Sequence, residues 1–176
     1  MIAESGGQFI SHVLDRPNLW FFNLYLPVAT GLEILLASYL LRPFIAKKMP
    51  YVFAAYMVLW GTVIWQHSIF DFAVTCLLAT ALLCTILFTV ILIDNAMNSD
   101  KGIFKDPLFW LCVAEILYYA CDIPEISTFT TAADEFIHKN KYMAIIGINE
   151  ILNVISPLLT GVSLVLCGRQ NKLQYV

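Results

Sequence analysis

The apolar stretch at residues 143–168 constrains the fold more than any other feature of the sequence. It holds about 26 residues and a single charged side chain, Glu150, and at a helical rise of about 1.5 Å per residue it can cross the roughly 30 Å hydrocarbon layer of a bilayer. The stretch is therefore predicted to be a transmembrane helix.

This predicted helix is not apolar on every side. Polar or small side chains recur along it at steps of three and four residues: Asn149, Asn153, Ser156, Thr160, Ser163 and Cys167. Such spacing places them on one face of a helix, which we call the polar stripe. Because contact with lipid does not satisfy polar side chains, the polar stripe is predicted to face other helices or a polar cavity.

Composition also indicates a membrane protein. Hydrophobic residues make up 60% of the 176 residues, charged residues make up 13%, and the mean hydropathy is +0.76. Soluble domains are about 45–50% apolar and about 25% charged. We predict an all-α fold class with one transmembrane domain over residues 1–176. This integral membrane bundle has five transmembrane helices, at residues 19–41, 51–67, 72–93, 107–122 and 143–168. Asp106 and Pro107 are expected to begin the fourth helix, and Pro124 to end it.

The distribution of basic residues predicts the orientation of these helices. Lys and Arg are more frequent in cytoplasmic loops than in outer ones. With five crossings, one side holds seven of the ten basic residues, namely Arg42, Lys47, Lys48, Lys101, Lys105, Arg169 and Lys172. The N-terminus is therefore predicted to lie outside and the C-terminus in the cytoplasm.

Charge and motifs exclude several classes of function. The net charge is −3 and the basic residues form no block, so neither nucleic-acid binding nor strong electrostatic binding to anionic lipid is predicted. The sequence has no HExxH, GxSxG, P-loop or GxGxxG motif. His67 and Asp71 have the spacing of half a metal site, but a hydrogen-bonded turn explains them better. We expect a non-enzymatic protein with no metal and no cofactor.

Three carboxyl groups are predicted at membrane depth, on Glu33, Glu115 and Glu150. An acid at the centre of a transmembrane helix costs about 2.5–3.5 kcal/mol on the insertion scale. No Lys or Arg lies at a comparable depth, so these acids are expected to be protonated or hydrogen-bonded to polar side chains. The candidate ligand-binding or proton-linked residues are Glu33, Glu115, Glu150, Asn149, Asn153 and Tyr119. Two interpretations stay open, a polar pocket or neutral hydrogen-bonding contacts between helices.

Aromatic side chains gather in the fourth predicted helix, at Phe109, Trp110, Tyr118 and Tyr119. Such clusters usually pack between helices or anchor the chain at the membrane surface. A small hydrophobic ligand, such as a quinone or a lipid, would also use them together with a nearby Glu.

The C-terminal part resembles the multi-pass membrane sensing regions of some bacterial two-component histidine kinases. The matching segments are DPLFWLCVAEILYYACDIP and INEILNVISPLLTGVSLVL, with Phe109, Trp110, Tyr118 or Tyr119, and Asn153 at the recurring positions. The resemblance covers roughly the last 70 residues. Those regions have seven helices where this chain has five, and no kinase or coiled-coil segment follows Gly168. The resemblance implies ligand sensing in signal transduction and a location in the bacterial plasma (inner) membrane.

The sequence thus favours a non-enzymatic integral membrane module that senses a ligand or docks a partner through an intramembrane polar pocket. Its expected partners are the lipid bilayer, a small hydrophobic ligand and a partner membrane protein. Two alternatives stay open, a small accessory subunit of a larger membrane complex and a small proton-linked transporter.

Overall fold

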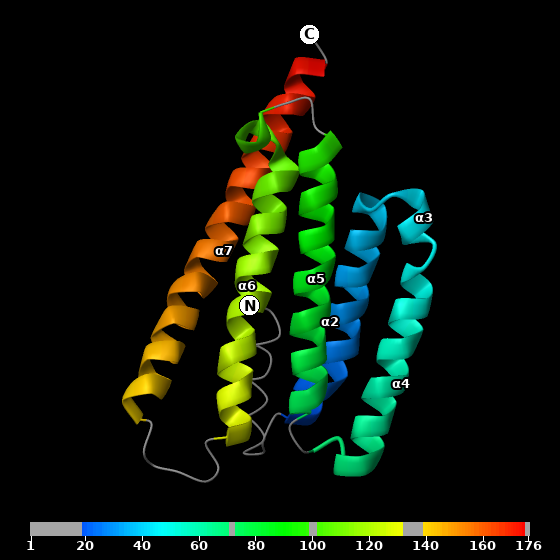
Figure 1. Cartoon of the computed structure of the whole chain (residues 1–176), viewed down its shortest axis with the longest axis vertical. Coiled ribbons are helices and arrows are strands. Elements are labelled where there is room, and N and C mark those ends of the chain that lie inside the picture. Colours follow the sequence, from blue (N-terminus) through cyan, green and yellow to red (C-terminus); the bar gives the residue numbers. More distant parts are fainter. Residues whose placement is uncertain (1–18, 71–72, 99–101, 132–138, 175–176) are drawn as a thin grey trace. The chain divides into compact units, whose positions relative to one another are not determined.

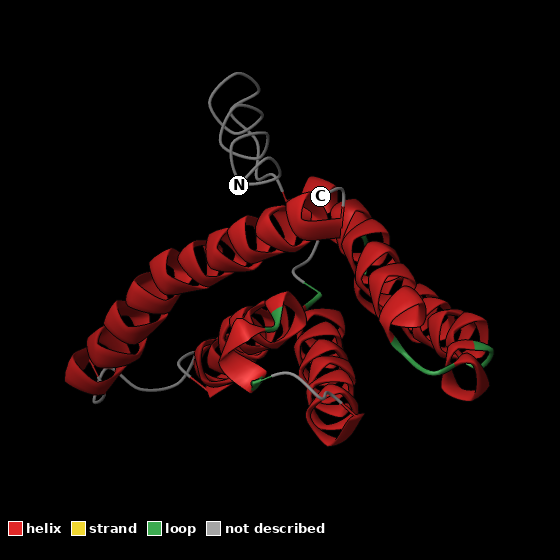
Figure 2. Cartoon of the chain, turned by 90° about the horizontal axis from the view of Figure 1, so that it is seen from above, coloured by secondary structure: helices red, strands yellow, loops and turns green. Residues whose placement is uncertain are grey.

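The computed structural model describes residues 19–70, 73–98, 102–131 and 139–174 (Figure 1). These residues form helices joined by short loops, with no strand among them (Figure 2). The helices are α2 (Leu19–Leu40), α3 (Pro43–Ala46), α4 (Met49–His67), α5 (Val74–Asn98), the 3-10 turn η1 (Ile103–Lys105), α6 (Pro107–Thr131) and α7 (Lys139–Gln174). The predicted all-helical class is confirmed.

Four of these helices are long and apolar enough to cross a membrane, at Trp20–Leu40, Val74–Asn98, Pro107–Pro124 and Glu150–Arg169. The chain is therefore an integral membrane protein with several transmembrane helices. The remaining long helix, α4, covers the predicted span at 51–67 but is not one of the four. Its tyrosines, its early proline and its polar end at Gln66 and His67 lower its apolar character.

The structure corrects one predicted helix end. Pro124 was expected to end the fourth helix, but α6 continues through it to Thr131. A proline inside a helix removes one backbone hydrogen bond and bends the helix. In a membrane, leaving the helical conformation would expose many more unpaired backbone groups, so a helix that contains proline is the less costly choice. Pro27 in α2 and Pro157 in α7 are also inside helices.

The chain divides into two compact units, Met1–Thr80 and Ala81–Val176, and each is described by itself. The first unit holds α2, α3, α4 and the first turns of α5. In this unit α2 and α4 lie side by side and run in opposite directions (Figure 1). One apolar cluster of its core consists of Val63, Ala73 and Cys76, with the partly buried side chains of Leu26, Leu59, Trp60 and Ile64 packed against them.

The turn after α4 contains a strained residue. Ser68 has φ 78° and ψ 149°, a conformation that is almost restricted to glycine. Its backbone N–H still donates to the Ile64 carbonyl, 3.0 Å away, and closes the end of α4. The Phe70 N–H donates to the Ser68 hydroxyl over 3.4 Å. The strain therefore lies at the point where the chain turns from α4 toward α5.

We expect Ser68→Gly to raise the free energy of unfolding by about 1 kcal/mol, because glycine adopts this conformation without steric strain. Glycine also gives the unfolded chain more conformational freedom, which offsets only part of this stabilisation. Ser38→Gly is the matched control, since Ser38 lies inside α2. That change should lower the stability by about 0.5 kcal/mol. Thermal unfolding in detergent measures both, and a loss of stability in Ser68→Gly would contradict the assigned strain.

In the second unit, side-chain hydrogen bonds fix the start of α6. The Asp106 carboxylate accepts a hydrogen bond from the Leu108 backbone N–H (2.9 Å) at one oxygen and from the Asn95 side chain (2.9 Å) at the other. The predicted helix cap at Asp106 is thus confirmed, and it also connects the end of α5 to the start of α6. The Trp110 indole N–H donates to the Phe104 carbonyl (2.9 Å) and fixes the intervening turn.

In the same unit α6 and α7 pack as an antiparallel pair (Figure 1). The Ser156 hydroxyl donates to the Ala114 carbonyl over 3.0 Å, and both residues are buried. Ser163, two turns further along α7, is also buried. Small side chains allow this close approach of two backbones, as is usual between transmembrane helices.

Candidate functional site

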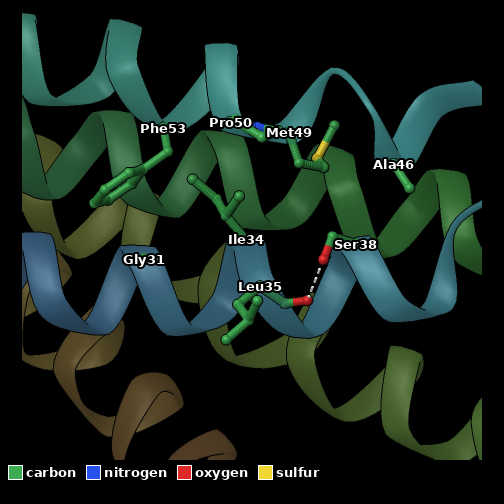
Figure 3. Close-up of a pocket in the computed structure, with 8 residues that line it drawn as sticks. All are labelled: Gly31, Ile34, Leu35, Ser38, Ala46, Met49, Pro50 and Phe53. Carbon is green, nitrogen blue, oxygen red and sulfur yellow. Dashed lines mark hydrogen bonds between the residues drawn. The ribbon is translucent and has the colours of Figure 1, made fainter.

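An open groove lies in the first unit, between α2 and α4, and has a volume of about 300 Å³. We call it the α2–α4 groove. Figure 3 shows α2 residues on one wall and α4 residues on the other, with α3 at one end. Its lining residues are Gly31, Ile34, Leu35, Ser38, Ala46, Met49, Pro50 and Phe53. Most of them are apolar, so the groove is suited to a hydrocarbon chain or ring.

One end of the groove is closed by Phe53. A Cβ atom at Gly31 would lie 3.1 Å from Cε2 of the Phe53 ring, closer than ordinary van der Waals contact. Glycine at this position therefore lets the ring lie against the α2 backbone. Gly61, on α4, has no such neighbour within 4 Å.

The one hydroxyl group in the lining is already satisfied. Ser38 donates to the Leu35 carbonyl of its own helix over 2.7 Å, as Figure 3 shows. A serine that is bonded to its own helix turns little polar character toward a ligand. The groove lining therefore offers dispersion contacts and a hydrophobic surface.

The other end of the groove adjoins a basic segment. Lys47 and Lys48 lie between two lining residues, Ala46 and Met49, and both lysine side chains are exposed. The Lys48 ammonium lies 4.6 Å from the centroid of the Phe44 ring, a cation–π contact. This end follows directly after the apolar part of α2, which ends at Leu40 and is long enough to cross a membrane.

Away from the groove, the side chain of Asn23 bonds to the backbone of the turn that follows α4. Asn23 is 2% exposed, and its side chain donates to the Ile69 carbonyl (2.7 Å) and accepts from the Ala73 N–H (3.3 Å). It thereby holds the turn between α4 and α5 against α2. Buried amides with both ends bonded stabilise a structure and are poor candidates for ligand contact.

A proline explains a second contact of Asn23. In a regular helix the N–H of residue 27 would donate to the carbonyl of residue 23, but Pro27 has no N–H. The Trp60 indole N–H donates to this carbonyl instead, over 2.9 Å. A side chain of α4 thus replaces a backbone donor that α2 lacks.

A third buried contact joins all three long helices of the unit. The hydroxyls of Thr30 on α2 and Thr80 on α5 lie 2.9 Å apart, and both residues are buried. The Thr80 hydroxyl also lies 3.0 Å from the Tyr56 hydroxyl on α4. These hydroxyl groups fix the positions of the three helices along one another. All three take part in hydrogen bonds, so they are poor candidates for acid–base chemistry.

The predicted acids lie in different parts of the chain. Glu33 is half-buried on α2, between the groove residues Gly31 and Ile34, and belongs to the first unit. Glu115 is half-buried on α6 and Glu150 is exposed on α7, both in the second unit. Since Ser156 lies opposite Ala114, the antiparallel register sets Glu115 and Glu150 about 8 Å apart along the helix axes. Their roles stay predictions.

The other predicted site residues are on α6 and α7. Tyr119 is half-buried one turn after Glu115, and its ring centroid lies 5.1 Å from that of Tyr118 in an edge-to-face pair. Asn153 is exposed. The side chain of Asn149 lies outside the part of the chain whose side chains the structure describes.

The polar stripe faces inward only in its middle. Ser156 and Ser163 are buried and Thr160 is half-buried, whereas Asn153 and Cys167 are exposed. Within the second unit, α6 therefore covers only the middle of the polar stripe. A single neighbouring helix covers a limited length of α7, and Figure 1 shows α6 and α7 diverging toward the loop that joins them.

Neither the α2–α4 groove nor the role of Asn23 is predicted from the sequence. The groove depends on the small residues Gly31, Ser38 and Ala46 lying opposite the start of α4, and one sequence does not show which residues oppose each other. A signal for Asn23 was present, because a polar residue four positions before a proline inside an apolar helix marks a carbonyl that needs another donor.

Among the described residues, no three His, Cys, Asp or Glu side chains lie together in a way that could hold a metal ion. Comparisons of the chain with family models, with curated proteins and with solved structures found no match. The groove and the buried polar contacts are therefore the features from which a function is inferred.

Proposed function

We propose that this integral membrane protein is a non-enzymatic module that takes up a hydrophobic ligand from the bilayer in the α2–α4 groove. The groove itself carries the proposal. It is apolar, it is open, and its volume of about 300 Å³ is at the lower end of the range for ligand sites. The buried amide of Asn23 and the buried hydroxyls of Thr30 and Thr80 are engaged in hydrogen bonds within the same unit, so they serve as a scaffold.

Ligand sensing is the finer part of this proposal. Glu33 is on α2 but does not line the groove, and at about 100° per residue it lies on the opposite side of the helix. Occupation of the groove would therefore reach its carboxyl group only through a movement of α2. The resemblance of the C-terminal segments to bacterial sensing regions supports the same role. The acids and amides of the second unit, Glu115, Glu150, Asn149 and Asn153, together with Tyr119, would then transmit the signal or dock a partner.

The alternative of an accessory subunit is favoured by one observation on α7. Asn153 is exposed beside Ile151 and Val154, which are 61% and 63% exposed. An amide facing lipid is unfavourable, so a partner helix is the natural neighbour for this face. Native mass spectrometry after gentle extraction would detect a stoichiometric partner chain, and a monomer without other proteins would count against the subunit role.

We also propose that α4 is a fifth crossing. It pairs with α2 at two levels, through Phe53 next to Gly31 and through Trp60 bonded to Asn23. A helix that runs antiparallel to a transmembrane helix over this length covers the same depth of the membrane. With five crossings, the charge distribution favours an N-terminus outside and a C-terminus in the cytoplasm. The resemblance to bacterial sensing regions favours the plasma (inner) membrane of a bacterium.

Reporter fusions test the fifth crossing. Fusions after Lys48 and after Val176 are expected to give fluorescent green fluorescent protein, which folds in the cytoplasm. A fusion after Ser68 is expected to give active alkaline phosphatase, which requires the outer side. Fusions after Lys48 and Ser68 that report the same side would show that α4 does not cross.

Filling the groove tests the proposed function. We expect Ser38→Leu combined with Ala46→Leu to reduce labelling of the purified protein in nanodiscs by phosphatidylcholine with a diazirine in its acyl chain. A drop of about tenfold corresponds to the loss of about 1.4 kcal/mol of binding. The labelled peptides of the unchanged chain should come from residues 31–38 and 46–53.

Thr62→Leu is the matched control for this experiment. Thr62 is exposed on α4, and like Ser38 it donates only to a carbonyl of its own helix, that of Val58 at 2.8 Å. It does not line the groove. Its replacement adds the same apolar side chain to the same unit and should leave the labelling unchanged. Equal labelling of all three proteins would overturn the proposed function.

A further inference from the structure

We propose that the ligand of the α2–α4 groove is an anionic glycerophospholipid, held with one acyl chain in the groove and its phosphate at Lys47 and Lys48. This inference rests on the proposed function and names the chemistry of its ligand. Three independent features of the first unit support it: the charge of the segment, the level of the groove in the membrane, and the position of the two lysines.

The chain around the α3 end of the groove carries positive charge only. Between Glu33 and Asp71 the chain has no Asp or Glu, and its basic residues are Arg42, Lys47 and Lys48. Seven of the lining residues, from Ile34 to Phe53, lie within this interval, and Gly31 lies before Glu33 at the far end of the groove from α3. A ligand whose head lies at the α3 end of the groove therefore meets a field of one sign, which favours an anion.

The α3 end also lies where a phosphate group would be. The transmembrane part of α2 ends at Leu40, and α3 begins three residues later. Tyr39 and Tyr51, on either side of this turn, are 80% and 77% exposed, and Phe44 on α3 is 74% exposed. Exposed aromatic side chains of this kind mark the boundary between headgroups and acyl chains.

The two lysines connect the charge to the groove. Their backbone lies between Ala46 and Met49, which both line the groove, and their side chains are exposed. Lys48 lies over the Phe44 ring at 4.6 Å, so its ammonium stays close to the apolar surface instead of extending into water. An acyl chain between Ile34 and Phe53 would place its head group beside these two ammonium groups.

This site differs from the electrostatic binding that the sequence excludes. A polybasic surface holds anionic lipids by charge alone and needs several Lys or Arg residues. Here the groove contributes apolar contact, and two lysines need only distinguish an anionic head from a zwitterionic one. A count of basic residues along the chain does not detect such a site.

The same diazirine label on phosphatidylglycerol and on phosphatidylcholine tests the inference, with the full chain in nanodiscs that contain both lipids. In nanodiscs both leaflets have the same composition, so the orientation of the chain does not affect the result. We expect phosphatidylglycerol to label the groove peptides about five to ten times more than phosphatidylcholine at low salt. This preference should fall as salt rises.

Lys47→Gln combined with Lys48→Gln should abolish the preference while phosphatidylcholine labelling stays unchanged. Lys105→Gln combined with Arg169→Gln is the control, because it removes the same charge from exposed positions in the second unit. Equal labelling by both lipids, or a preference that survives the loss of both lysines, would overturn the inference. If groove-filling Ser38→Leu and Ala46→Leu still suppress both lipids in that case, the proposed function stands without the anionic preference.

Discussion

Replacement of Asn23 by alanine is expected to lower the free energy of unfolding by about 2–3 kcal/mol, because each buried polar group that loses its partner costs about 1–3 kcal/mol. The side chain of Asn23 is almost fully buried and bonds both the Ile69 carbonyl and the Ala73 N–H. Alanine satisfies neither group, and the surroundings admit little water. Alanine has a higher helix propensity than asparagine, but this offsets the loss of stability by only about 0.7 kcal/mol or less.

Asn98→Ala is the matched control for this substitution. Asn98 also lies in a helix, but it is exposed, and its amide donates to Asp94 one turn earlier in the same helix. Its loss should change the stability by less than about 0.5 kcal/mol. Thermal unfolding of the three proteins in one detergent measures the difference, and equal melting temperatures for Asn23→Ala and Asn98→Ala would contradict the structural role of Asn23.

Trp60→Phe is expected to lower the free energy of unfolding by about 1–2 kcal/mol in the natural chain. Phenylalanine keeps most of the apolar contact of the ring but removes the N–H that bonds the Asn23 carbonyl. Pro27 cannot replace this donor, since it has no N–H of its own. The loss should therefore exceed that expected from the change in ring size alone.

The same substitution should have a much smaller effect in a Pro27→Ala background. Alanine at position 27 has an N–H that can donate to the Asn23 carbonyl within the helix, so the indole is no longer needed. We expect a coupling of about 1 kcal/mol between the two positions, well above the scatter of about 0.3–0.5 kcal/mol for independent sites. Equal effects of Trp60→Phe in both backgrounds would show that the indole contact does not compensate for the proline.

These contacts divide the first unit into a polar end and an apolar end. Asn23, Trp60 and Ile69 bond at one end of the α2–α4 pair, and the groove lies at the other, near α3. Helices that are fixed by hydrogen bonds at one end can leave a space at the other end without separating. Variants at Asn23 or Trp60 that remain folded should therefore keep the groove.

Sequence alone determined the class of this protein and most of its helix positions. A run of apolar residues long enough to cross the bilayer must form hydrogen bonds within itself, so α2, α5 and α7 were predictable from residue types. The start of α6 at Asp106 was predictable for a similar reason, because an aspartate before a proline supplies a local cap. Each of these features depends on neighbours a few residues away.

Tertiary structure decided which side chains meet. The α2–α4 groove depends on Gly31 lying opposite Phe53, and the role of Trp60 depends on its position beside the Asn23 carbonyl. The polar stripe of α7 followed its predicted spacing, yet only its middle found a partner in α6. Helical periodicity places residues on a face, but only packing against another helix determines whether that face is covered, because the contact joins residues far apart in the chain.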